Sequence, residues 1–287
     1  MAQQLDSATG EALLARVRFY RDLGLTEFYR RPVDPALFAQ LATAPDPQQN
    51  EIMGGPGLAS ETLDQSPQST DSQEGNPIPP RKQMPAPPSI ATIVPAAERA
   101  AALQLIREEI GECTRCALHK GRNKLVFGDG NPAARLMFVG EGPGADEDAQ
   151  GLPFVGKAGQ LLNNMITAMG LKREEVYIAN VVKCRPPGNR VPEQEEGATC
   201  SPFLFRQIDV VRPQVLVALG ATAATWLLGA RQPLAGLRGR VHAVRGTQLI
   251  VTYHPAYLLR DPRQKKEAWA DLQIAMRELG LKAPGKS

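Results

Sequence analysis

Short apolar runs alternate with longer helical patterns over the last two thirds of the chain. Strand-like runs rich in β-branched residues lie at 135–140, 176–182, 215–220 and 249–254. Helical patterns lie near 97–110, 157–169, 193–210, 220–229 and 265–280. Such alternation is typical of a parallel sheet with helices on both faces. The pattern therefore predicts a three-layer α/β/α domain over residues 96–287, with a mainly parallel central sheet.

The first 95 residues have a different pattern. Between Glu11 and Arg31, apolar side chains recur at helical spacing, which predicts a helical extension over residues 1–44. That helix either packs on the main domain or docks a protein partner. Residues 45–95 contain eleven prolines and no Phe, Trp or Tyr. Such a segment cannot bury enough apolar surface to order itself, so we expect a disordered linker there.

Composition narrows the class of protein only slightly. The chain has 287 residues, 43% of them hydrophobic, and a formal net charge of +3. This charge is compatible with a nucleic-acid-binding protein and equally with an ordinary enzyme. No apolar run reaches the roughly 18 residues of a membrane span, and the N-terminus lacks the features of a secretory signal. We therefore expect a cytoplasmic, monomeric protein without membrane contact.

The four cysteines form a candidate metal site. Cys113 and Cys116 make a C-x-x-C pair, and fifteen residues separate Cys184 from Cys200. Disulfides would be the simplest interpretation, but a cytoplasmic chain argues against them. A metal centre with four thiolate ligands accounts for all four residues. Zinc and an iron–sulfur cluster both accept that ligand set, and the spacing leaves both open.

Polar residues follow three of the four predicted strands. The first strand leads into Gly140-Glu141-Gly142-Pro143-Gly144-Ala145, the second ends near Asn180, and the fourth delivers His254. Ligands bind beyond the carboxyl ends of parallel strands, so we expect these groups to share one crevice.

The glycine-rich loop matches by letter the template for binding a dinucleotide pyrophosphate. Pro143, however, lacks the N–H that such a loop needs, and residues 146–148 are acidic. The next helix is expected only near Gly156, a dozen residues late. We therefore reject a dinucleotide cofactor.

Three motifs together resemble one enzyme family. GEGPGADEDAQGLPFVGKAGQLL, NVVKCRPPGNR and HPAYLLR, with the cysteine set, resemble the family-four uracil-DNA glycosylases, which carry a 4Fe–4S cluster. The resemblance spans roughly residues 101–280 and leaves residues 1–95 unmatched. It implies hydrolysis of the N-glycosidic bond of uracil in single- or double-stranded DNA, which initiates base-excision repair. It also implies a 4Fe–4S cluster held by Cys113, Cys116, Cys184 and Cys200.

The resemblance also implies roles for residues around the base. Phe154 would stack on uracil, Asn180 would read its polar edge, and the Gly142 backbone would approach it. Cytosine carries an amino group where uracil has a carbonyl, so a fixed amide would be mismatched against it. Buried hydrogen-bonding groups left unpaired in this way can discriminate by about 10⁴ or more.

For the chemical step, the resemblance points to a histidine and two carboxylates. His254 would stabilise the negative charge that builds on the 2-carbonyl oxygen of the leaving uracil. Glu141 and Glu147 would either act on the sugar side or hold the loop in shape. Better-known uracil glycosylases have an activating aspartate where this chain has Gly142, so the identity of the general base stays open.

Basic residues beside the motifs are candidate contacts to the DNA backbone: Lys183, Arg185, Arg190 and Arg260. Two alternatives to a glycosylase remain. Relatives that trap uracil-DNA without turnover carry a basic, histidine-containing insertion after the asparagine strand, and KCRPPGNRVPEQEEG has neither. The other alternative is a cluster-bearing module of a replication protein, which the chain's length and low aromatic content disfavour.

Overall fold

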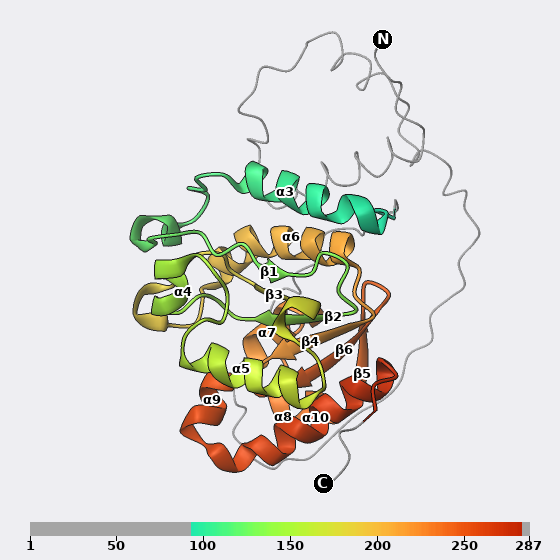
Figure 1. The fold of residues 1–287 in the computed structure, drawn as a ribbon. Helices are drawn as coiled ribbons and strands as arrows, with labels where there is room; N and C mark the ends of the chain where they lie inside the picture. The colour runs from blue at the N-terminus through green and yellow to red at the C-terminus, as the bar shows by residue number, and fades with distance from the viewer. Residues whose placement is uncertain (1–92, 283–287) are drawn as a thin grey trace, which may run out of the picture. The chain divides into compact units, whose positions relative to one another are not determined.

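A computed structural model of the chain describes residues 93–282 (Figure 1). The predicted N-terminal helical extension and nearly all of the predicted linker lie outside these residues, as do residues 283–287. The expectations for residues 1–92 therefore stay predictions.

A six-stranded sheet forms the centre of the domain, in the order β1-β3-β2-β4-β6-β5. The four inner strands are parallel, and both edge strands are antiparallel to their neighbours. The strands are β1 Asp129–Gly130, β2 Leu136–Gly140, β3 Tyr177–Asn180, β4 Val215–Leu219, β5 Val241–Val244 and β6 Thr247–Thr252. The sequence predicts the four inner strands and misses the edges, because β1 has two residues and β5 is largely exposed.

Helices connect the strands and cover both faces of the sheet. The α-helices are α3 Arg99–Ile110, α4 Ala145–Gln150, α5 Lys157–Ala168, α6 Gln194–Val211, α7 Ala221–Leu228, α8 Leu234–Leu237, α9 Pro255–Arg260 and α10 Lys265–Glu278. The 3-10 turns are η1 Ala96–Glu98, η2 Ala117–Gly121, η3 Arg173–Glu175, η4 Pro187–Asn189 and η5 Pro262–Gln264. Within residues 93–282, each helix expected from the sequence is present within a few residues of its predicted bounds.

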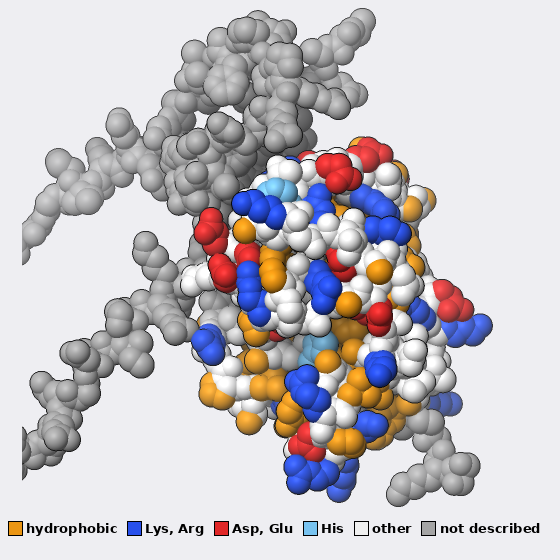
Figure 2. All heavy atoms as spheres, turned by 90° about the vertical axis from the view of Figure 1, so that its left-hand side faces the viewer, with side chains coloured by type: hydrophobic (Ala, Val, Ile, Leu, Met, Phe, Trp, Pro, Cys, Tyr) orange, Lys and Arg blue, Asp and Glu red, His pale blue; other side chains and the backbone are white. Residues whose placement is uncertain are grey.

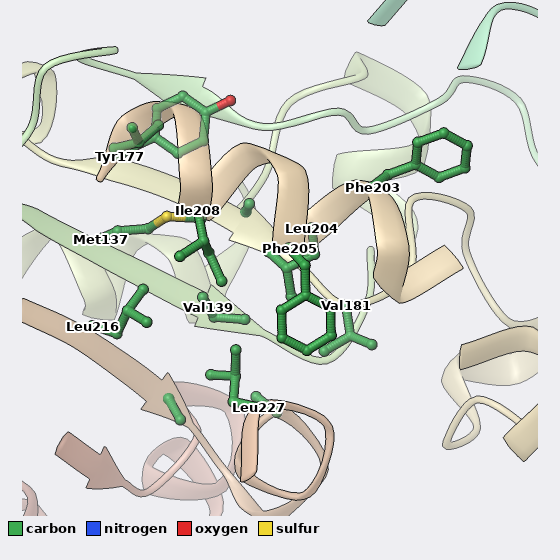
Figure 3. Packing of buried hydrophobic residues seen from close by; sticks show 14 of the residues in the cluster. Met137, Val139, Tyr177, Val181, Phe203, Leu204, Phe205, Ile208, Leu216 and Leu227 are labelled. Carbon is green, nitrogen blue, oxygen red and sulfur yellow. The ribbon is translucent and has the colours of Figure 1, made fainter. Parts of the chain in front are cut away.

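Alternating strand residues feed two separate hydrophobic clusters, one on each face of the sheet. Met137 and Val139 of β2 pack with residues of α3, α6 and α7. Figure 3 shows part of this cluster, with side chains of α6 above the strands. Leu136 and Phe138 pack on the opposite face, with residues of α5 and α10. Because side chains alternate between faces along a strand, inner strands buried on both faces are largely apolar. The predicted three-layer α/β/α architecture is confirmed.

The glycine-rich loop is followed at once by a helix, so the sequence prediction of a late helix is wrong. α4 begins at Ala145, with Gly144 at its N-cap. Its first turn carries three acidic residues, and Glu147 accepts a hydrogen bond from the Gly144 N–H at 3.0 Å. A carboxylate of the chain thus uses an N–H that a pyrophosphate would need. Dinucleotide binding stays rejected for this reason.

Within residues 93–282, none of the helices combines the length and the apolar character needed to span a lipid bilayer.

Candidate active site

The sequence-predicted pocket residues meet at the carboxyl edge of the parallel strands. Gly140, the last residue of β2, is paired in register with Asn180, the last residue of β3. β6 ends at Thr252, two residues before His254. Ligand sites of open α/β sheets lie at this edge. The chain order thus brings the loop, Asn180 and His254 together, as the sequence pattern predicts.

Asn180 carries a polar atom without a partner. The residue is 1% exposed, and its Oδ1 is a buried side-chain oxygen that has no hydrogen bond within the described part of the chain. An unmade hydrogen bond of a buried group costs about 1–3 kcal/mol. Such groups in native structures call for an explanation, and a ligand that supplies the missing donor is one. The orphaned Oδ1 therefore marks a place for an N–H donor of a ligand.

Phe154 lies beside Asn180 in an unusual backbone conformation. Its φ angle is 53°, in the left-handed region, which costs a non-glycine residue about 1–2 kcal/mol. A Cβ added at Gly140 would lie 2.6 Å from the Phe154 ring and would also collide with Asn180 Oδ1. Glycine at position 140 thus lets the aromatic ring and the amide approach the same strand end.

His254 completes this group from the opposite side of the sheet centre. Its imidazole and the Phe154 ring have centroids 5.6 Å apart. Nδ1 accepts a hydrogen bond from the Ala256 N–H at 3.1 Å. In the neutral ring the proton is then on Nε2, which acts as a donor. Burial, helped by the charge of Arg260 and opposed by that of Glu147, lowers the pKa of His254 to about 4.

The two candidate carboxylates have different surroundings. Glu147 is buried and accepts backbone hydrogen bonds from Gly144 at 3.0 Å and from Val155 and Gly156, each at 2.9 Å. These contacts are those of a residue that shapes the loop. Glu141 is half-buried, and burial raises its pKa, partly offset by a hydrogen bond with Thr222. Of the two, Glu141 has the carboxylate with the fewer partners.

Gly142 has no room for a side chain. A Cβ there would lie 2.7 Å from a methyl group of Val182. An aspartate at this position would require Val182 to shift. The structure thus explains why this loop carries glycine and supplies no carboxylate at that point.

Lys183 does not contact solvent, so its predicted role on the DNA backbone is wrong. The residue is 1% exposed, and its Nζ donates hydrogen bonds to the Asn180 carbonyl at 2.9 Å and to Gln207 Oε1 at 2.5 Å. Burial lowers the pKa of its ammonium group to about 8. Lys183 instead supports the end of β3 from inside the domain.

The three arginines predicted to bind DNA all reach the surface. Arg260 is exposed at the end of α9. Arg185 is partly exposed, and its Nε donates to Asn189 Oδ1 at 2.8 Å. Arg190 forms a two-pronged pair with Glu196, with distances of 2.8 and 2.7 Å. Figure 2 shows basic side chains in several separate groups over the face that it presents.

The four thiols lie together around one cavity. Cys113, Cys116, Cys184 and Cys200 line one cavity, and none of them is in a disulfide. Burial raises the pKa of Cys200 to about 12. Among residues 93–282, no three or more His, Cys, Asp or Glu side chains are arranged to hold a single metal ion.

Hydrogen-bond donors point at three of these sulfurs. Arg115 Nη1 lies 3.3 Å from Cys113 Sγ, and Arg122 Nη1 lies 3.4 Å from Cys184 Sγ. The Lys183 backbone N–H donates to Cys200 Sγ at 3.3 Å. Burial raises the pKa of the Cys184 and Cys200 thiols, and the neighbouring cations and N–H groups partly oppose this rise. The donor set and its surroundings therefore fit a thiolate-bound metal centre.

Comparison with known proteins assigns the family. The model of the uracil DNA glycosylase superfamily matches residues 127–273, which include the sheet, the glycine-rich loop and His254. The chain therefore belongs to the uracil-DNA glycosylase superfamily.

Within that superfamily, the chain is similar to type-4 uracil-DNA glycosylases. It is 47% identical over 161 residues to the type-4 uracil-DNA glycosylase of Thermotoga maritima. This match covers 55% of this chain and 84% of the relative. It is 42% identical over 187 residues to that of Archaeoglobus fulgidus, covering 62% and 94% of the two chains. It is 44% identical over 181 residues to that of Pyrobaculum aerophilum, covering 60% and 92%. The N-terminal extension is unmatched by these relatives.

Sequence reasoning missed Gly140 as a packing requirement, Thr222 as the partner of Glu141, and Arg173 as a contact of the Phe154 loop. Gly140 could have been noted as a glycine at the end of a predicted strand, but Phe154 and Asn180 become its neighbours only in the fold. Neither Thr222 nor Arg173 belongs to a motif, and only the fold brings them to the site.

Proposed function

We propose that this protein is a uracil-DNA glycosylase that hydrolyses the bond between uracil and deoxyribose, which leaves an abasic site and initiates base-excision repair. Membership of the superfamily and the similarity to type-4 enzymes support this activity. The observation that carries the site is the orphaned Oδ1 of Asn180 beside the Phe154 and His254 rings.

Recognition requires that the uracil leave the base stack or come from a single strand. In our proposal Phe154 packs on the face of the extruded base, and Gly142 leaves its backbone open to it. The Asn180 Oδ1 accepts the uracil N3–H, and the amide nitrogen donates to the 4-carbonyl oxygen. Cytosine has an acceptor and an amino group at these two positions, so both contacts would fail.

His254 stabilises the leaving group in the proposed mechanism. The neutral ring, held with its proton on Nε2, donates to the 2-carbonyl oxygen as negative charge develops there. A donor placed for the developing charge stabilises the transition state more than the ground state. Glu141 lies on the loop next to the reacting sugar, where its carboxylate would offset positive charge and orient the attacking water. Glu147 acts through the loop that it braces.

The DNA backbone would lie along Arg185, Arg190 and Arg260. Within residues 93–282, neither Arg185 nor Arg260 forms an ion pair with an acidic side chain, whereas Arg190 shares its charge with Glu196. We therefore assign the larger contributions to Arg185 and Arg260.

We also propose that Cys113, Cys116, Cys184 and Cys200 hold a 4Fe–4S cluster. The four thiols line one cavity, and four Cys thiolates are the ligand set that such a cluster takes. The cluster would supply a structural cross-link and no step of the reaction. Arg115, Arg122 and the Lys183 N–H would offset the charge of its thiolates.

A reducing compartment suits four free thiols, and we propose that the enzyme works in the cytoplasm as a monomer. The predicted N-terminal helix remains a candidate docking element for a protein partner.

The activity is tested by incubating iron-loaded, full-length protein with uracil-containing single- and double-stranded oligonucleotides, followed by alkali. We expect strand breakage at the abasic site. His254→Ala should lower the rate by about 10²–10³, and Asn180→Ala should lower both the rate and the preference for uracil over cytosine. His242→Ala, on the edge strand β5, serves as the control. A gel-stable adduct without breakage would instead identify a protein that traps uracil-DNA, and full activity of both site variants would refute the assigned residues.

A further inference from the structure

The loop that carries Phe154 contacts three separate elements. Glu147 of α4 accepts the N–H groups of Val155 and Gly156, both at 2.9 Å. Gly159 of α5 leaves space for the Phe154 carbonyl, where an added Cβ would collide. The third support comes from η3, the turn that leads into β3.

Arg173, the first residue of η3, binds the carbonyls on both sides of the Phe154 nitrogen. Its Nη2 donates to the Pro153 oxygen at 2.5 Å, and its Nη1 donates to the Phe154 oxygen at 3.1 Å. The Phe154 peptide groups are therefore fixed in orientation on both sides of a residue whose φ is 53°. A planar guanidinium is suited to this task, because its donors are arranged in a rigid fork.

The guanidinium is itself held in place. Nη1 also donates to Asn163 Oδ1 of α5 at 2.8 Å, and Nη2 lies 3.6 Å from a carboxylate oxygen of Asp129 in β1. The Arg173 side chain is 24% exposed, so these contacts are partly shielded from water. Arg173 thus links the Phe154 loop to α5, to β1 and to the start of β3.

We propose that Arg173 is a positioning residue for uracil recognition, which holds Phe154 at a fixed place relative to Asn180. β3 begins two residues after η3 and ends at Asn180, so one short element supports both the stacking ring and the edge-reading amide. The inference rests on the proposed roles of Phe154 and Asn180. Arg173 acts through Phe154 and does not itself contact the base.

A double-mutant cycle on full-length protein tests this inference. Arg173→Gln should lower kcat/KM on uracil-containing DNA by tenfold or more, up to about 10²-fold, since a small misplacement of a positioning group can cost that much. In a Phe154→Ala background, the same substitution should cost almost nothing further, because the residue through which it acts is gone. Inhibition by free uracil should weaken in Arg173→Gln, while binding of uracil-free single strands should not change.

Arg135→Gln is the matched control. Arg135 precedes β2 at the other end of the sheet, where it donates to the Leu279 carbonyl at 2.6 Å and to Gln214. It should lower thermal stability without changing kcat/KM. Arg173→Lys keeps the charge with fewer donors and should lose less activity than Arg173→Gln. It provides the test if Arg173→Gln does not fold.

The outcomes separate the inference from the site assignment. Full activity of Phe154→Ala would refute the stacking role and the inference with it. If Phe154→Ala lowers activity but the effect of Arg173→Gln simply multiplies with it, Phe154 keeps its role and the positioning role of Arg173 is refuted. Unchanged activity and uracil inhibition in both folded Arg173 variants would refute it as well.

Discussion

One backbone hydrogen bond determines which ring nitrogen of His254 carries the proton. The Ala256 N–H occupies Nδ1, which leaves Nε2 as the donor, and burial keeps the ring neutral. A neutral imidazole donates to a developing oxyanion without an uncompensated charge in the free enzyme. The first turn of α9, with Pro255 fixing its direction, is therefore part of the proposed catalytic arrangement.

The depressed pKa of His254 predicts a dependence of stability on pH. Its pKa is about 4 in the folded protein, against about 6.5 when unfolded, so folding favours the neutral ring. Its contribution is fully present above pH 6.5 and is lost as the pH falls toward 4. Between pH 7 and 5 the loss should reach about 2 kcal/mol. Urea unfolding of the native protein and of His254→Gln should show a smaller loss for the variant. Equal losses would contradict the neutral, buried ring.

At the scale of elements, the short helix α4 determines the form of the loop between β2 and α5. Its Glu147 accepts the N–H groups of Gly144 at one end of that loop and of Val155 and Gly156 at the other, eight and nine residues beyond Glu147 in the chain. Glu141, in contrast, directly follows β2 and has Thr222 of α7 as its partner. One carboxylate thus belongs to the scaffold and the other to the crevice.

Paired substitutions distinguish these roles. Glu147→Gln should destabilise the fold by about 1–3 kcal/mol, because an amide accepts the backbone N–H groups less well than a carboxylate. Glu141→Gln should leave the free energy of unfolding nearly unchanged and should lower kcat. Because the Glu141 pKa is raised, the acid limb of the native kcat/KM profile should lie above the usual range of a glutamate, and it should vanish in Glu141→Gln. Chemical unfolding and single-turnover kinetics measure both effects.

At the scale of the whole molecule, the sequence predicts those features that depend on a local pattern of residues. The four inner strands are found because their residues are apolar on both faces, and Asn180 and His254 are found because they follow such strands. The burial of Lys183 could not be found in this way. The Pro186-Pro187-Gly188 turn that follows it is typical of a loop, and its partner Gln207 lies 24 residues away on α6. Only the packing of α6 on the sheet removes this lysine from solvent.

The salt dependence of DNA binding tests whether the exposed Arg185 and Arg260, and not the buried Lys183, contact phosphates. Arg185→Gln and Arg260→Gln should each reduce the slope of log K against log salt by about 0.7–0.9, the contribution of one phosphate contact. Lys183→Met should leave the slope unchanged, because no phosphate reaches a residue that is 1% exposed. Fluorescence anisotropy with a uracil-free single strand at several salt concentrations gives the slopes. A reduced slope for folded Lys183→Met would show that this lysine contacts the DNA backbone after all.

The positions of the four cysteines along the chain have a consequence for chain connectivity. Cys116 and Cys184 enclose residues 117–183, which include Glu141, Phe154 and Asn180, whereas His254 lies outside. With the proposed cluster in place, the segment with the proposed recognition residues would be a closed ring of polypeptide, whereas His254, the proposed leaving-group donor, would lie outside this ring. Closing a ring lowers the entropy of the unfolded chain within it. Loss of iron should therefore loosen uracil recognition before it disturbs the segment around His254, which limited proteolysis can follow in time.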